Sequence, residues 1–151
     1  MRNNESGFSL VELIIVIAIM AILIALLAPQ YVRYVEKSRL ANDVQVIAAI
    51  HNALAVAITD ENIENRPLAG FTPPQIKLED LDTPTYYTPY KEFVDEFKGF
   101  LNINDISTLK GHLKAKAYKG QDILVQIDGS TQKITVTVVS GLSGVDDIVI
   151  E

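Results

Sequence analysis

The sequence predicts an α+β protein in which one long N-terminal helix packs against a C-terminal antiparallel sheet. An apolar run from Phe8 to Ala28 continues, with no turn signal, into a helical pattern of apolar residues that reaches Ile58. In the last third of the chain, apolar residues alternate with polar ones between turn residues, as in strands with one buried face. The 151 residues suffice for one domain with its own core.

The first half of the long helix, residues 8–29, has the composition of a transmembrane segment. Its only charged side chain is Glu12. The apolar run would form about 31 Å of helix, which matches the hydrocarbon core of a bilayer. We therefore expect this half to lie in a membrane.

The second half, residues 30–60, is predicted to be amphipathic. From residue 40 its apolar residues recur mostly at intervals of three and four, which is the spacing of one helix face. We expect that face to pack on the protein's own domain, completing a helix of about 50 residues and about 80 Å. The predicted stripe comprises Val32, Val35, Leu40, Val44, Ile47, Ile50, Leu54 and Ile58.

The remaining residues, 61–151, are predicted to form a globular head. Five prolines make residues 62–98 a loop region, except for a short amphipathic helix from Tyr90 to about Lys98 that Thr88 and Pro89 would open. The sheet is expected within residues 112–150, with a hairpin turn at Asp128-Gly129-Ser130. The predicted strands are 112–118, 122–128, 133–140 and 146–150.

A hexapeptide, Gly7-Phe8-Ser9-Leu10-Val11-Glu12, stands between the short polar segment 1–7 and the apolar run. It resembles the prepilin cleavage signature of the type IV pilin and pseudopilin family. The resemblance implies a leader peptide of residues 1–7, removed after Gly7 by a prepilin peptidase that also methylates the new N-terminus at Phe8. It also implies a head on a long helix, the pilin lollipop.

Glu12 is the most informative single residue in the sequence. A carboxylate within a membrane helix costs about 2.5–3.5 kcal/mol on insertion scales, so it requires a partner or a function. The resemblance implies that Glu12 pairs with the N-terminal amine of Phe8 in a neighbouring subunit of a filament. The alternatives are that Glu12 reaches towards the headgroups or is protonated.

Pro29 is predicted to break or bend the helix, because it cannot donate a hydrogen bond to the carbonyl of Ala25. Two explanations stay open, namely local unwinding in a filament, which the resemblance implies, and an end to the span at the lipid interface. Beyond it, Arg33, Lys37 and Arg39 favour a cytoplasmic location for the head by the positive-inside rule. The resemblance implies the opposite orientation, with the head outside.

The composition excludes several kinds of site. The net charge of −6 disfavours binding to nucleic-acid backbones, and the absence of cysteine excludes disulfides, thiolate zinc sites and cysteine nucleophiles. Many pilins close their C-terminal region with a disulfide, which this chain cannot form. No catalytic, cofactor or metal motif is present, so an enzyme is not expected.

The weaker candidates have ordinary structural explanations. His51 and His112 have no third ligand in the sequence, and Asp146, Asp147 and Glu151 lack the spacing of a calcium loop. A cluster of tyrosines could serve an adhesive or inter-subunit surface, or simply pack against the sheet. Its members are Tyr86, Tyr87 and Tyr90.

The sequence and the resemblance together predict a structural subunit of a type IV pilus, which serves adhesion, motility or DNA uptake. The implied partners are a prepilin peptidase, other pilin subunits, membrane lipid, an inner-membrane platform protein and an assembly ATPase. The implied location is a cell membrane, crossed once with the head outside, and then an extracellular filament. Alternatives are a pseudopilin of a type II secretion or competence system, a single-pass membrane-anchored binding protein and, least favoured, an enzymatic domain.

Overall fold

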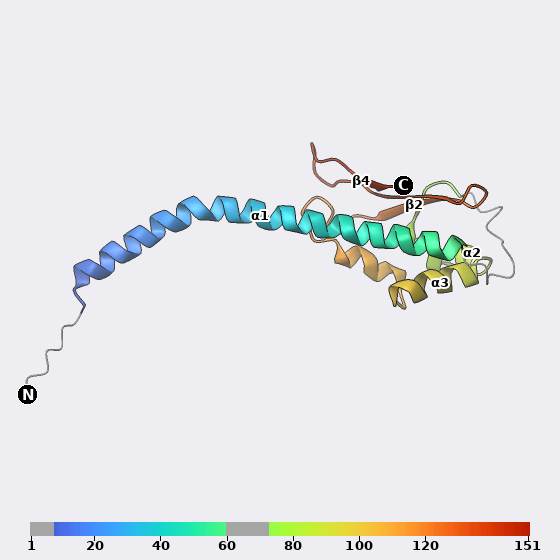
Figure 1. The fold of residues 1–151 in the computed structure, drawn as a ribbon, viewed down its shortest axis with the longest axis horizontal. Helices are drawn as coiled ribbons and strands as arrows, with labels where there is room; N and C mark the ends of the chain where they lie inside the picture. Colours follow the sequence, from blue (N-terminus) through green and yellow to red (C-terminus); the bar gives the residue numbers. More distant parts are fainter. Residues whose placement is uncertain (1–7, 60–72) are drawn as a thin grey trace, which may run out of the picture. The chain divides into compact units, whose positions relative to one another are not determined.

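A computed structural model describes residues 8–59 and 73–151 (Figure 1). The predicted leader, residues 1–7, and the first part of the predicted loop region, with Pro67, lie outside the described residues. The chain divides into two units, residues 1–37 and 38–151, which are treated separately below. The elements in chain order are α1 (Leu10–Thr59), β1 (Ile76–Lys77), η2 (Leu78–Asp82), α2 (Pro84–Tyr87), α3 (Lys91–Leu101), η3 (Ile106–His112), β2 (Ile123–Asp128), β3 (Lys133–Val138) and β4 (Ile148–Ile150).

The first unit consists of the N-terminal part of α1. Every described residue from Phe8 to Tyr34 is exposed, although most of these side chains are apolar. Within the described part of the chain, α1 alone is long and apolar enough to cross a membrane. The exposed apolar surface therefore requires lipid or protein around it.

The second unit, the head, contains the C-terminal part of α1 and all later elements. The buried side of α1 carries Ile47, Ile50, Leu54 and Ile58, as predicted. Leu40 and Val44, however, are partly exposed, and the fully buried residue at this end of the stripe is Asp43. The prediction was wrong at these two positions because a hydrogen-bonded carboxylate occupies the buried face there. It was also wrong at Val32, which is exposed within the first unit.

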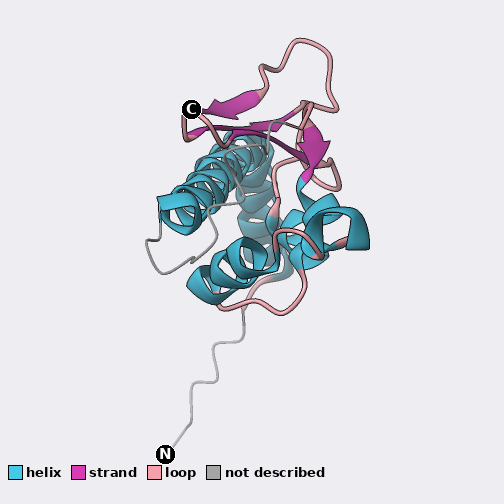
Figure 2. Ribbon diagram, turned by 90° about the vertical axis from the view of Figure 1, so that its right-hand side faces the viewer, coloured by secondary structure: helices cyan, strands magenta, loops and turns pink. Residues whose placement is uncertain are grey.

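The sheet has the order β1-β2-β3-β4, and each neighbouring pair is antiparallel. The register places Ile123 opposite Val138 and Val125 opposite Val136, and all four are buried. One face of the sheet thus packs against the core, with the helices of the head on that side (Figure 2). The last three predicted strands are confirmed, with ends that differ by up to two residues.

The predicted strand at residues 112–118 is wrong. The 3₁₀ helix η3 ends at His112, and turns follow it up to residue 120. The backbone N–H groups of Lys114 and Ala115 donate to the carboxylate of Asp43. In a β-strand they would instead donate to the carbonyl groups of a neighbouring strand. The fourth strand is β1, which lies within the predicted loop region.

The predicted short helix is confirmed as α3, but its start differs. Thr83 caps α2, with Pro84 in the first helical position, and Thr88 ends that helix. Tyr90 is the cap of α3, so the predicted opening at Thr88 and Pro89 is wrong. At the other end, Asn102 has φ 53°, a left-handed conformation that asparagine tolerates well and that commonly ends helices.

Candidate functional site

The residues of the hexapeptide lie where α1 begins. Gly7 lies outside the described residues. The side chain of Phe8 is 92% exposed, and α1 starts two residues later at Leu10. The backbone N–H of Ser9 donates to Oε2 of Glu12 at 2.9 Å.

This hydrogen bond is half of a capping box, in which a side chain three residues into the helix accepts from the cap residue's N–H. It satisfies one of the backbone donors that a helix start leaves unpaired. The Ser-x-x-Glu spacing of residues 9–12 carries this signal, which the sequence interpretation missed. Glu12 therefore caps the start of its own helix.

Pro29 lies inside α1, and the helix continues on both sides of it. A proline at this position leaves the carbonyl of Ala25 without its intrahelical donor. The helix break predicted at Pro29 for a filament or a lipid interface stays a prediction.

Asp43 is the one charged residue that the structure fully buries among those it describes. Its Oδ1 accepts from the N–H of Lys114 at 2.8 Å, and its Oδ2 accepts from that of Ala115 at 2.8 Å. Two backbone donors thus satisfy a carboxylate whose burial would otherwise be unfavourable. Asp43 therefore links the segment after η3 to α1. The sequence signal that could have identified it is its position four residues before Ile47, which places both residues on the same face of the helix.

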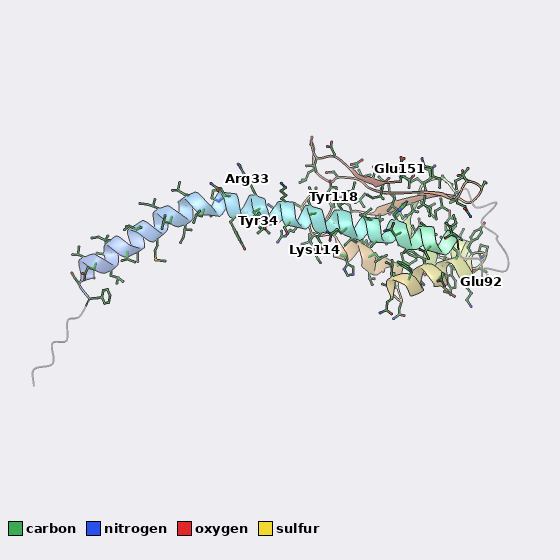
Figure 3. The ribbon with its side chains drawn as sticks, viewed as in Figure 1. Arg33, Tyr34, Glu92, Lys114, Tyr118 and Glu151 are labelled. Carbon is green, nitrogen blue, oxygen red and sulfur yellow. The ribbon has the colours of Figure 1, made fainter. Side chains whose placement is uncertain are left out.

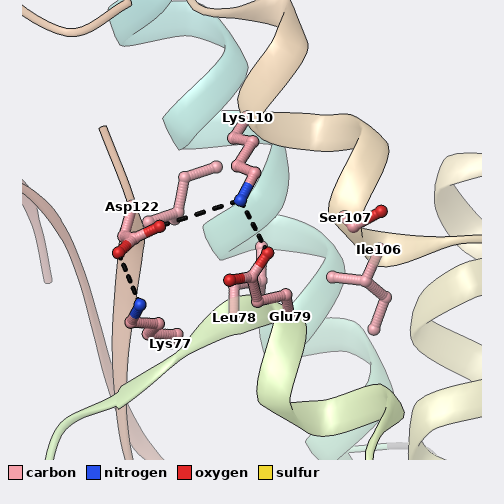
Figure 4. Close-up of a pocket in the computed structure, with 8 residues that line it drawn as sticks. Lys77, Leu78, Glu79, Ile106, Ser107, Lys110 and Asp122 are labelled. Atoms are coloured by element: carbon pink, nitrogen blue, oxygen red, sulfur yellow. Dashed lines mark hydrogen bonds and ion pairs between the residues drawn. The ribbon is translucent and has the colours of Figure 1, made fainter. Parts of the chain in front are cut away.

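Charged side chains surround a shallow hollow between β1, η2 and η3 (Figure 4). Lys77 pairs with Asp122 at 2.8 Å, and Lys110 pairs with Glu79 at 2.9 Å and with Asp122 at 3.9 Å. The hydrogen bond from Lys77 lowers the pKa of the Asp122 carboxyl. The hollow therefore holds mutually neutralising pairs and offers no net charge to a ligand.

We predict that this ion cluster loses its contribution to stability in acid. A carboxyl with a lowered pKa stabilises the folded state above its ordinary value of 3.8, and that contribution disappears as the pH falls through the lower folded pKa. We expect the difference in denaturation midpoint between wild type and Asp122→Asn to be present at about pH 7 and to shrink as the pH falls below the ordinary carboxyl value of 3.8. A difference that is the same at both pH values would contradict this assignment.

Hydrogen bonds hold the loop between β3 and β4 in place. A disulfide cannot do so, because the sequence contains no cysteine. The N–H of Ser140 donates to Oδ1 of Asp147 at 2.8 Å, and the N–H of Gly141 donates to the carbonyl of Ala117 at 2.7 Å. The hydroxyl of Tyr118 donates to the carbonyl of Asp146. Burial raises the pKa of Tyr118, so this hydroxyl keeps its proton at neutral pH.

Replacing Tyr118 with Phe removes only that hydrogen bond, and we expect a loss of about 1 kcal/mol in the free energy of unfolding. Loosening of the loop should also speed protease cleavage within residues 139–147. Tyr31→Phe, a change on the exposed part of α1, should alter neither measurement. Unchanged stability in Tyr118→Phe would show that the loop is held by other contacts.

The other candidate residues are dispersed over the head. Among the described residues, no three His, Asp or Glu side chains gather in a way that could hold a metal ion. Tyr86, Tyr87 and Tyr90 are partly buried and pack against the core. The hydroxyl of Tyr87 donates to Asp95 at 3.0 Å, and Lys98 lies 5.3 Å from its ring centre.

At the C-terminus, Glu151 pairs with Lys133 at 3.4 Å, and Asp147 accepts from Ser140. The two predicted histidines belong to separate elements, with His51 partly buried in α1 and His112 exposed at the end of η3.

Comparison with known proteins agrees with the resemblance that the hexapeptide indicates. Residues 2–28 match the family model described as the prokaryotic N-terminal methylation motif. The chain is 31% identical over 72 residues to the type IV major fimbrial protein FimA of Dichelobacter nodosus, which is 48% of this chain and 46% of that protein.

Two further relatives match part of the chain. The prepilin peptidase-dependent protein A of Clostridium perfringens is 33% identical over 64 residues, which cover 42% of this chain and 46% of that protein. The fimbrial protein Q of Moraxella bovis is 43% identical over 56 residues, covering 37% and 36%.

The chain covers less than half of the length of each of these relatives, and no solved structure matches it significantly. Two of these relatives are named fimbrial proteins. The methylation motif, the long apolar helix that contains it and these relatives together make the N-terminal part of the chain similar to that of type IV pilins.

Proposed function

We propose that this protein is a precursor subunit of a type IV pilus, which is cleaved after Gly7 and polymerises through its N-terminal helix. The observation that carries the proposal is the match of residues 2–28 to the methylation motif at the start of a spanning-length apolar helix. Two of the relatives described above are named fimbrial proteins, which favours a pilus over a secretion pseudopilus.

Processing would create a positively charged amine at Phe8, one turn from Glu12. In the filament, Glu12 of an incoming subunit would pair with the Phe8 amine of a subunit already in place. Such a pair is strong where water is excluded, and it would fix the axial register between neighbouring helices. The apolar surface of α1, exposed in the isolated chain, would exchange lipid for other copies of the same helix.

The proposed subunit crosses the membrane once before assembly, with its head outside, and ends in an extracellular filament. Its partners would be the prepilin peptidase, other pilin subunits, the platform protein and the assembly ATPase. Residues 61–151 would form the outer shell, and Pro29 would supply the site of local unwinding. The name of the Clostridium relative supports the dependence on a prepilin peptidase.

Intact-mass spectrometry of protein sheared from the cell surface tests this function. We expect a mass that lacks residues 1–7 and carries one additional methyl group on Phe8. A chain that begins near Pro29 would instead indicate an ordinary signal peptide, and an uncut chain a simple membrane anchor. Either result would overturn the proposal.

A further inference from the structure

A single aspartate of the sequence, Asp128, directly precedes a glycine. It is the last residue of β2, and Gly129 is the first residue of the turn to β3. Glycine has no side chain to obstruct its own backbone nitrogen, so the aspartate before it is open to attack by that nitrogen. Every other aspartate precedes a residue with a side chain, and no asparagine precedes a glycine. Asp128-Gly129 is therefore the pair in this chain best suited to isomerisation.

Isomerisation needs only water as a co-reactant. In the first step, the backbone nitrogen of Gly129 attacks Cγ of the protonated Asp128 carboxyl. A C–N bond forms, the carboxyl hydroxyl leaves as water with the hydrogen of that nitrogen, and a five-membered imide results. Water then adds to one of the two imide carbonyl carbons and breaks its bond to nitrogen. Addition at Cγ restores aspartate, whereas addition at the main-chain carbonyl carbon leaves isoaspartate, in which the backbone runs through the former side chain.

The folded turn holds both reacting groups away from each other. Asp128 pairs with Lys133 in the ladder and is extended, whereas ring closure requires the Gly129 nitrogen to rotate until it eclipses Cβ of Asp128. Oδ1 of Asp128 accepts from the N–H of Ser130 at 2.9 Å and from that of Thr131 at 3.2 Å. These bonds hold the carboxylate against the N–H groups that follow the attacking nitrogen.

The same hydrogen bonds favour the ionised carboxylate, which does not react. The bonds from Thr131, and then those from Ser130, lower the pKa of the Asp128 carboxyl. The amino group of Lys133, the cross-strand neighbour of Asp128, pairs at 3.4 Å with Glu151, which is labelled in Figure 3. The donors of the turn therefore hold the Asp128 carboxylate, while the neighbouring lysine pairs with another acid.

We propose that Asp128-Gly129 is the isomerisation site of the head and that the folded β2–β3 turn suppresses the reaction, which proceeds only when the turn opens. The product would disturb the hairpin, because isoaspartate adds one backbone carbon at the end of β2. Ile127 and Ile134 lie opposite each other beside the turn and are buried, so a shifted register would disrupt core contacts. Nothing in this chemistry depends on the proposed pilus function.

The test incubates the full chain in detergent micelles, in the same mildly acidic buffer with and without urea. Isoaspartate is counted by enzymatic transfer of a labelled methyl group to its free carboxyl, and peptide mapping locates it in the chain. We expect isoaspartate to accumulate at Asp128 in urea and to form at least about tenfold more slowly in the folded protein. A tenfold difference corresponds to about 1.4 kcal/mol for opening of the turn.

Two kinds of variant separate the chemistry from the protection. Gly129→Ala places a methyl group beside the attacking nitrogen and should slow the reaction in urea. Ser130→Pro removes the donor at 2.9 Å and should raise the rate in the folded protein about fivefold, the factor expected for one lost hydrogen bond. Its matched control, Ser130→Ala, keeps the N–H and should react like the wild type.

Equal rates with and without urea would overturn the suppression, and no isoaspartate at Asp128 in urea would overturn the site itself. A folded Ser130→Pro that reacts at the wild-type rate would overturn the role of the hydrogen bonds. If urea unfolding shows that Ser130→Pro does not fold, the two wild-type rates still decide the proposal. None of these results bears on the pilus function, which the mass of the sheared protein tests.

Discussion

Glu12→Gln is expected to abolish surface filaments while the protein still accumulates in the membrane in its cleaved form. The substitution removes the negative charge but keeps an oxygen that can accept from the N–H of Ser9, as Oε2 of Glu12 does. The helix start should therefore remain capped, and only the proposed pairing with the Phe8 amine is lost. Leaving one charge of such a pair without its partner costs about 3–5 kcal/mol, a decrease of about 100-fold or more in the constant for adding a subunit.

Quantitative immunoblotting of sheared and membrane fractions, with electron microscopy of the cells, measures this loss. Glu92→Gln makes the same chemical change in the first turn of α3, at an exposed position of the head, and should leave filaments at the wild-type amount. Normal filaments in Glu12→Gln would mean that Glu12 serves only as a helix cap or is already protonated.

Asp43→Ala is expected to destabilise the head by about 2–5 kcal/mol. Both carboxylate oxygens disappear, and the N–H groups of Lys114 and Ala115 lose their acceptor in a place where water has little access. Each unsatisfied buried donor costs about 1–3 kcal/mol. The segment that follows η3 should also separate from α1, because these bonds link it to the helix.

Urea unfolding of the full chain in detergent micelles measures the change. Asn42→Ala alters the neighbouring residue on the exposed side of the same helical turn and should change the free energy of unfolding by less than about 0.5 kcal/mol. Asp43→Asn, which retains one acceptor oxygen, should fall between wild type and Asp43→Ala. Wild-type stability in Asp43→Ala would show that water replaces the carboxylate.

Local patterns predicted the regular elements well. Apolar spacing predicted α1 up to Thr59, and alternation predicted β2, β3 and β4, because burial of one face imposes the period of the element on the sequence. The turn at Asp128 was equally clear, since its carboxylate accepts from the N–H groups of Ser130 and Thr131.

The same alternation led to a wrong prediction of a strand at residues 112–118. A segment with one buried and one exposed side shows period two whether or not a neighbouring strand pairs with it. Which group accepts the backbone N–H of Lys114 depends on Asp43, a residue 71 positions earlier in the chain. Local sequence cannot show such a partner, and for the same reason β1, with two residues, was missed.

The sequence by itself determined the character of the N-terminus. The hexapeptide, the single carboxylate of Glu12 and the length of the apolar run are properties of consecutive residues, and no folding is needed to read them. The tertiary structure alone decided how the head is held together without cysteine. Asp43 links the segment after η3 to α1, and Tyr118 and Asp147 hold the β3–β4 loop. These links join residues far apart in the chain, so their energies depend on distances that only the folded molecule defines.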